Sequence, residues 1–288
     1  MAGSPRFAIC NEIFGKTPFG QACKIASSLG YEGIEIAPFT LAEDAGSLPP
    51  EHRANIRTAM ADAGLEFVGL HWLMASPPGL HMTTRDESIR TRTWQYLHRL
   101  IDLCADLAVP GRECCGVMVL GSPKQRSAVN GMTPREAIDI FTHELAHAAP
   151  HAESRGVKIL VESLSPDQTN VVNCLKDAVN IVKQIGSPAV QTMFDTHNAV
   201  DEHDSHAELL RRYHPYIKHV HVNEIDGREP GTGSYDFASL LDALSAGKYN
   251  GWVSLEVFDF SRDGEEIARN AIEFLKKDRP QEALTHTA

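Results

Sequence analysis

Four ionisable side chains in the second half of the chain stand at or near the end of a short apolar run. They are Glu162 after 157–161, Asp195 after 190–194, His221 within 217–222 and Glu256 after 252–255. Three carboxylates and one imidazole form a ligand set that suits Mn²⁺, with Mg²⁺, Co²⁺, Zn²⁺ and Fe²⁺ as alternatives. Because like charges gathered closely repel one another, a cation between them would keep all three carboxylates ionised. The pattern therefore predicts one divalent-metal site.

These side chains can converge if the runs that carry them are strands of one sheet. Strand-like and helix-like stretches alternate eight times along the chain, without a break in composition. The expected strands are 7–10, 33–36, 66–70, 116–120, 157–161, 190–194, 217–222 and 252–255, and the expected helices are 19–29, 51–63, 86–107, 134–155, 171–185, 205–213, 236–244 and 264–276. Each strand is a short continuous apolar run, which is typical of a parallel sheet covered on both faces.

This alternation predicts an α/β protein, a (β/α)8 TIM barrel that forms a single catalytic domain over residues 1–277. Residues 278–288 are polar and are expected to form a flexible C-terminal tail. The competing fold is a doubly wound open sheet, which favours a glycine-rich phosphate turn after its first strand. Residues 11–15 read Asn-Glu-Ile-Phe-Gly and contain no such motif.

A barrel carries its active site at the C-terminal ends of its strands, and this rule selects further candidates. His71 and Trp72 follow the third strand, where they either bind or stack on a substrate or pack beneath the loop 73–84. The loop 121–126 after the fourth strand carries two cations, which could hold a phosphate or carboxylate group. A solvated loop is the preferred interpretation there.

Several other polar residues are interpreted as structural or solvated. Buried or structural roles are expected for Glu12, Glu35 and His219, and solvated positions for His203, His206 and His214.

The composition limits the classes of function. The chain has 288 residues, with 27 Lys and Arg against 38 Asp and Glu, and a formal charge of −11. This balance argues against nucleic acid as a partner, since phosphate binding relies on clustered Lys and Arg. No apolar run reaches the roughly 18–20 residues that span a bilayer, and the N-terminus lacks the apolar region of a secretory signal. The six scattered cysteines fit reduced thiols, so we expect a cytoplasmic protein without a membrane partner.

The segments around the four candidate ligands resemble a known superfamily. They are Val161-Glu162-Ser163-Leu164, Phe194-Asp195-Thr196-His197, the segment 219–224, and Ser254-Leu255-Glu256. The chain is similar here to the xylose-isomerase-like TIM barrels, and within them to the D-tagatose and D-psicose 3-epimerases. The separations from 162 to 195 to 221 to 256 are 33, 26 and 35 residues, and they fit the spacing of that branch.

The resemblance implies a metal-dependent sugar epimerase or aldose–ketose isomerase. One metal would be held by Glu162, Asp195, His221 and Glu256, and the two glutamates would double as acid and base. A proton next to a carbonyl is too weakly acidic for an unaided carboxylate, and a chelated cation stabilises the enediolate. Epimerisation also needs one group to remove a proton and another to return one from the opposite face.

The substrate-binding residues implied are His71, Gln168, His197 and Arg228. The family histidine lies three residues after the strand-six aspartate, whereas His197 lies two after Asp195. The family arginine falls at Gly227, one residue before Arg228, and Gln168 stands in place of a glutamate. The metal chemistry therefore carries over more directly than the identity of the sugar.

Three alternatives stay open. The same barrel and proton abstraction serve a lyase or dehydratase on a keto-sugar or cyclitol. A DNA-repair endonuclease of the endonuclease IV type shares the superfamily, but the acidic charge counts against it. A non-catalytic sugar-binding barrel has no need of both Glu162 and Glu256. A small-molecule sugar is thus the expected partner, and a homo-oligomer, dimer or tetramer, is also expected.

Overall fold

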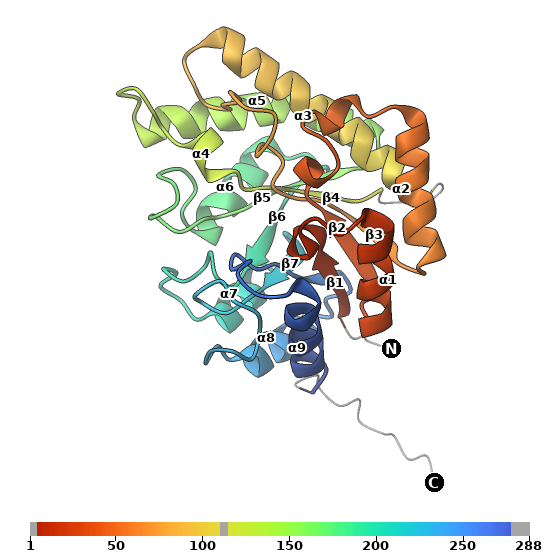
Figure 1. Ribbon diagram of the computed structural model, residues 1–288. Coiled ribbons are helices and arrows are strands. Elements are labelled where there is room, and N and C mark those ends of the chain that lie inside the picture. Colours follow the sequence, from red (N-terminus) through yellow and green to blue (C-terminus); the bar gives the residue numbers. More distant parts are fainter. Residues whose placement is uncertain (1–4, 110–114, 278–288) are drawn as a thin grey trace.

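Eight parallel strands close into one barrel, with each strand hydrogen-bonded to its neighbours in sequence order and β8 paired with β1 (Figure 1). The structure is a computed structural model and describes residues 5–109 and 115–277. The predicted (β/α)8 barrel is confirmed. The tail expected at 278–288 lies outside the described residues.

The strands and helices agree closely with the expected ranges. The strands are β1 Arg6–Cys10, β2 Gly33–Ile36, β3 Glu66–Leu70, β4 Val117–Leu120, β5 Lys158–Val161, β6 Val190–Asp195, β7 Ile217–Val222 and β8 Trp252–Leu255. The helices are α1 Phe19–Leu29, α2 Pro50–Asp62, α3 Glu87–Leu107, α4 Pro123–Arg126, α5 Pro134–Ser154, α6 Leu175–Ile185, α7 His206–Tyr213, α8 Phe237–Ala246 and α9 Gly264–Lys277. Short 3₁₀ turns follow β1 and β2 (η1 Asn11–Phe14, η2 Pro38–Thr40, η3 Ala45–Ser47).

Two differences from the expected elements concern the mouth of the barrel. Helix α6 begins at Leu175 rather than at 171, because Val172 has a positive φ of 61° and Asn173 donates its side-chain amide to two loop carbonyls. A one-turn helix, α4, was not expected and follows directly after β4. Both changes shape the loops around the site.

The strand alternation explains how the ionisable residues reach the mouth. Side chains two residues apart on a strand share a face, and an apolar cluster of Ala8, Val68, Val117, Val119, Leu160 and Met193 occupies the interior of the barrel. Glu162 and Asp195 each lie two residues beyond a member of this cluster, so they point inward at the C-terminal end. The apolar packing below thus sets the direction of the acidic side chains above.

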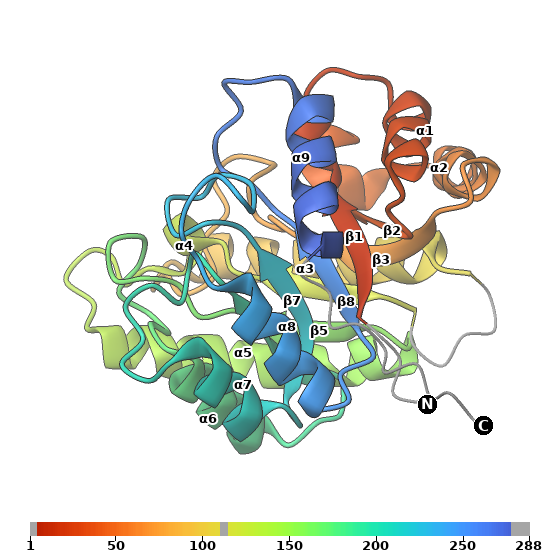
Figure 2. The ribbon, with the colours of Figure 1, turned by 90° about the horizontal axis from the view of Figure 1, so that it is seen from below.

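The helices form the outer layer and bury their apolar faces against the outside of the strands. Helix α9 lies beside α1 (Figure 2). The hydroxyl of Tyr31 donates to the carbonyl of Ala268 at 2.8 Å, which links the first and the last βα units of the barrel. Within the described ranges, no helix combines the length and the apolar character that crossing a membrane requires. The five cysteines described carry free thiols, and Cys114 lies outside the described residues.

Candidate active site

The four predicted metal ligands meet at the C-terminal end of the barrel. Each of Glu162, Asp195, His221 and Glu256 offers a ligand atom, these atoms all lie within 4.8 Å of one another, and all four residues are buried. The Nδ1 of His221 lies 2.9 Å from Oε2 of Glu256 and 3.7 Å from Oδ2 of Asp195. Four different strand ends therefore supply one compact set of donors.

The charges in this set conflict with one another. Burial, together with the carboxylates of Glu256 and Asp195, raises the pKa of Glu162 to about 8. Burial and Glu256 likewise raise the pKa of Asp195 to about 6. Burial opposes the ionisation of Glu256, but His221 and His71 hold its pKa well below the ordinary range. A divalent cation among these atoms would remove the conflict, so the residues fit a metal.

The orientation of His221 is fixed from below by Glu35. The Nε2 of His221 lies 3.1 Å from Oε2 of Glu35, and the Nε2 of His219 lies 2.8 Å from the same oxygen. Both histidines and Glu35 are fully buried. An imidazole that donates one nitrogen to a carboxylate keeps its other nitrogen available as a ligand. Glu35 and His219 are thus structural, as expected, and leave Nδ1 of His221 facing the ligand set.

His71 does not reach the substrate side of the site. Its ring is fully buried, with Nε2 at 2.9 Å from Oε2 of Glu12 and Nδ1 at 3.1 Å from Oε1 of Glu256. Although burial disfavours a charged ring, Cys10 and Glu12 raise the pKa of His71 well above its ordinary value. The expectation of direct substrate contact is therefore corrected, because both ring nitrogens are already engaged by carboxylates. The geometry instead makes His71 a support for Glu256.

Two asparagines that the sequence reasoning missed support the acidic ligands. Asn198 donates its side-chain amide to Oε1 of Glu162 at 2.9 Å and its backbone N–H to Oδ1 of Asp195 at 2.8 Å. Asn223 donates to Oδ2 of Asp195 at 3.3 Å. The signal for Asn198 was present in the sequence, because it stands three residues after Asp195, where the family carries histidine.

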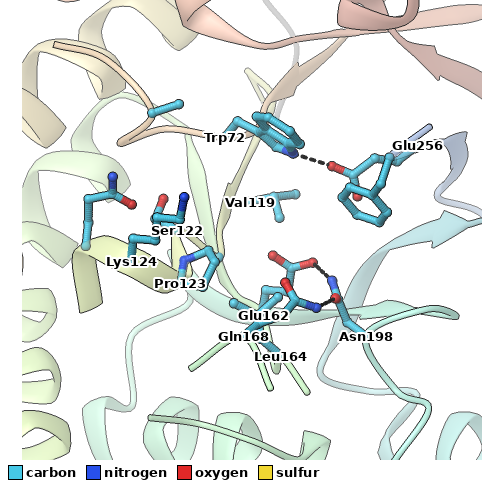
Figure 3. A pocket seen from close by; sticks show the side chains of 14 residues that line it. Trp72, Val119, Ser122, Pro123, Lys124, Glu162, Leu164, Gln168, Asn198 and Glu256 are labelled. Atoms are coloured by element: carbon cyan, nitrogen blue, oxygen red, sulfur yellow. Dashed lines mark hydrogen bonds between the residues drawn. The ribbon is translucent and has the colours of Figure 1, made fainter. Parts of the chain in front are cut away.

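A cavity of about 390 Å³ opens above the ligand set. Glu162 and Glu256 line it from facing sides (Figure 3), whereas Asp195 and His221 do not line it. Trp72, held at a positive φ of 51°, donates its indole N–H to Oε1 of Glu256 at 2.7 Å. The Trp72 ring also stacks on Phe258, with a centroid distance of 6.3 Å. An aromatic wall beside a carboxylate is suited to the apolar face and hydroxyls of a sugar.

The other predicted substrate residues divide into two groups. Gln168 lines the cavity and donates to Oδ1 of Asn198 at 2.6 Å. His197 and Arg228 are not among the lining residues. The Nδ1 of His197 lies 2.6 Å from the carbonyl oxygen of Ile225, and Arg228 forms an ion pair with Asp226 at 2.7 Å. The structure therefore brings only Gln168 of these three to the cavity wall.

The loop after β4 differs from the solvated loop that we expected. The guanidinium of Arg126 is fully buried and donates to the carbonyl oxygens of Leu120, Glu162 and Val172 at 3.2, 2.8 and 3.4 Å. Burial lowers the pKa of Arg126 to about 10. Lys124, by contrast, is exposed and lines the cavity. His206 is also more enclosed than expected, since its ring contacts Phe194 and lies 2.6 Å from the hydroxyl of Tyr235.

A sequence model of the xylose isomerase-like TIM barrel family matches residues 23–278. This chain belongs to that family. Among curated relatives, the L-ribulose 3-epimerase of Mesorhizobium japonicum is 26% identical over 211 residues, which cover 73% of this chain and 68% of the relative. The probable ketose 3-epimerase of a Synechocystis species is 24% identical over 250 residues, which cover 85% of this chain and 80% of the relative.

Solved structures share the fold of this chain. A D-psicose 3-epimerase determined with D-fructose superposes with a TM-score of 0.79 at 20% identity, over 94% of this chain and 98% of that one. The 3-keto-D-glucoside 4-epimerase from E. coli superposes with a TM-score of 0.81 at 18% identity, over 95% of this chain and 99% of that one. The barrel fold that they share thus extends over nearly all of this chain.

Proposed function

We propose that this protein is a metal-dependent sugar epimerase or isomerase that moves a proton at a carbon next to a carbonyl. The observation that carries the proposal is the placement of two carboxylates, Glu162 and Glu256, on facing sides of one cavity above a shared ligand set (Figure 3). Inversion at such a carbon needs an acid and a base on opposite faces of the substrate. The epimerases among the relatives support the same reaction class.

The residues have separate duties in this proposal. Glu162, Asp195, His221 and Glu256 would hold one divalent metal, with Mn²⁺ favoured for this donor set. When bound, the metal supplies a Lewis acid for the carbonyl oxygen of the substrate. Glu162 and Glu256 exchange the proton, each from its own side of the cavity.

Supporting side chains fix the two proton-transfer carboxylates. Asn198 holds Glu162 through one hydrogen bond, and Glu256 accepts hydrogen bonds from both Trp72 and His71. Such restraint is needed because a misplacement of about 1 Å costs roughly 10²-fold in rate. Gln168 and the ring of Trp72 contact the sugar, and the Trp72–Phe258 wall excludes water from one side of the cavity.

Proton exchange in D₂O tests the proposal. The Mn²⁺-loaded protein is incubated with free ketoses, ketose phosphates and 3-keto sugars, and each compound is followed by NMR. Deuterium next to the carbonyl, together with a new epimer or an aldose, supports the proposal. Loss of water or of another leaving group would assign the lyase alternative instead. No exchange with any compound in the presence of bound Mn²⁺ would contradict the proposed reaction.

Glu162→Gln and Glu256→Gln assign the two roles. Each should lower the exchange rate by at least about 10²-fold. The matched control is Glu273→Gln, since Glu273 is exposed on α9 and lies outside the barrel mouth. Full proton exchange in either variant would show that the substituted glutamate takes no part in the proton transfer.

A further inference from the structure

The two ends of the cavity differ in chemistry. Glu162 and Glu256 stand at one end, and the loop after β4 forms the other with Ser122, Pro123 and Lys124 (Figure 3). Among the described residues that line the cavity, Lys124 is the single cationic side chain. The cavity is therefore polarised along its length, with its carboxylates and its ammonium group at opposite ends.

The ammonium group of Lys124 is unpaired in the part of the chain that the structure describes. Within residues 5–109 and 115–277, its ammonium group has no hydrogen bond or ion pair, and the side chain is exposed. Other cations of the mouth are engaged, since Arg228 pairs with Asp226 and Arg262 pairs with Glu229. The chain has a net charge of −11, and two carboxylates line the same cavity as Lys124. Because Lys124 pairs with neither of them, its ammonium group is available to a ligand.

The backbone that carries Lys124 is tied firmly to Glu162. Arg126, two residues further on, donates from within the protein to the carbonyl oxygens of Glu162 and Leu120. The carbonyl of Gln125 accepts from the N–H of Met82 at 2.6 Å. Because the side chain of Arg126 is fully buried, the fold fixes the position of the Lys124 backbone relative to Glu162. This is how a subsite for the far end of a substrate must be built.

Electrostatics indicate the class of group that binds there. Three carboxylates gather at the ligand end and outnumber the two positive charges of one divalent cation, so an anion is favoured at the lysine end rather than there. We propose that Lys124 binds an anionic group, a phosphate or a carboxylate, at the end of the sugar remote from the reacting carbonyl. The ligands of this cavity are thus acidic sugars. That they are epimerised or isomerised rests on the function proposed above.

Binding of unreactive polyols tests this subsite without relying on turnover. Ribitol, ribitol 5-phosphate and ribonate lack a ketone or aldehyde, so they bind but do not react. Calorimetric titration of the Mn²⁺-loaded protein should give a Kd for at least one of the two anions that is about tenfold or more below that of ribitol. Preference for ribitol 5-phosphate identifies a phosphate subsite, and preference for ribonate identifies a carboxylate subsite. The preference should shrink as salt is added.

Variants of the lysine decide whether this residue causes the preference. Lys124→Gln should bring the ratio of the Kd of ribitol to the Kd of the preferred anion close to one. Lys124→Arg should keep the ratio of the unchanged protein. Lys24→Gln is the matched control, because Lys24 is exposed on α1 and the charge change is the same. A preference for the anion that persists in Lys124→Gln would show that the metal end binds it and would overturn the proposal, as would equal binding of all three polyols to the unchanged protein.

The two proposals can fail separately. Anion preference that depends on Lys124, without proton exchange for any carbonyl compound, would retain the subsite and reject the epimerase. Proton exchange with neutral ketoses, without any anion preference, would retain the epimerase and reject the subsite.

Discussion

Gly121 lies so close to Glu162 that a Cβ atom built on the glycine would overlap Oε2 of the glutamate. Gly121→Ala should therefore displace the carboxylate from the ligand set. We expect a fall in Mn²⁺ affinity and at least about a tenfold loss of kcat/KM, at an overpacking cost of about 1–3 kcal/mol in the free energy of unfolding. Calorimetric titration with Mn²⁺ measures the first effect. Gly20→Ala is the control, because a methyl group there meets Ala59 at an ordinary 3.7 Å.

Asn198 restrains the same carboxylate from the other side. Asn198→Ala removes a hydrogen bond to Glu162 but leaves the backbone N–H that holds Asp195. We expect kcat to fall by roughly 10- to 100-fold with a smaller change in stability, of about 1 kcal/mol. Steady-state kinetics on the substrate found by proton exchange measures the effect. The exposed Asn180 on α6 provides the same substitution as a control, and equal kcat values for the two variants would exclude a positioning role for Asn198.

His71 and Glu12 should behave as one unit. Each of His71→Asn and Glu12→Gln leaves a buried partner without its hydrogen bond, at a cost of about 1–3 kcal/mol. The double variant should lose less than the sum of the two single variants, because the second change removes a group that is already unpaired. Urea denaturation of the four proteins measures this coupling, with His203→Asn as an exposed control. Strict additivity would show that the two residues act independently.

Protons and metal should compete for the ligand set. In the metal-free protein the pKa of Glu162 is about 8 and that of Asp195 about 6, both above their ordinary values. Carboxyl groups with raised pKa values stabilise the fold at low pH, and this contribution is lost as the pH rises through those values. The Tm of EDTA-treated protein should therefore fall from about pH 4, where these carboxyl groups ionise in the unfolded chain, to about pH 8, where both are ionised in the folded protein as well. Metal binding needs ionised ligands, so the rise in Tm on adding Mn²⁺ should grow over the same interval.

Scanning calorimetry at several pH values measures both trends. The loss of Tm should be smaller in Glu162→Gln, which lacks the carboxyl group whose pKa is raised most. A Mn²⁺-induced rise that is the same at all pH values would contradict proton–metal competition at these residues.

The strands and the direction of the acidic ligands were predictable because they depend on local pattern. Apolar runs of four to six residues between glycine-terminated helices predicted the barrel, and the alternation of side chains placed Glu162 two residues beyond the buried Leu160. The fold and the convergence of the four candidate ligands could therefore be inferred before any contact was known. The family assignment followed from the same segments.

Contacts between distant strand ends could not be inferred in this way. His71 has polar neighbours in the turn after β1 and directly after β8, and nothing in its local sequence shows that Glu12 and Glu256 engage both ring nitrogens. The two terminal amino groups of Arg126 donate to backbone carbonyls, which carry no sequence signal at all. In both cases the local sequence does not show the partners of the polar residue, because the fold supplies them from elsewhere in the chain.

The buried guanidinium of Arg126 also has a consequence for engineering. Loops at the mouth of a barrel are usually exchanged independently of one another to change specificity. Here the loop 121–127 is bound to the end of β5, because Arg126 donates to the carbonyl oxygen of Glu162. A transplanted loop without the arginine would leave the carbonyl of Glu162 without this donor and release the strand end that carries the carboxylate. Specificity libraries for this barrel should therefore keep Arg126 constant and vary Lys124 and Gln125 around it.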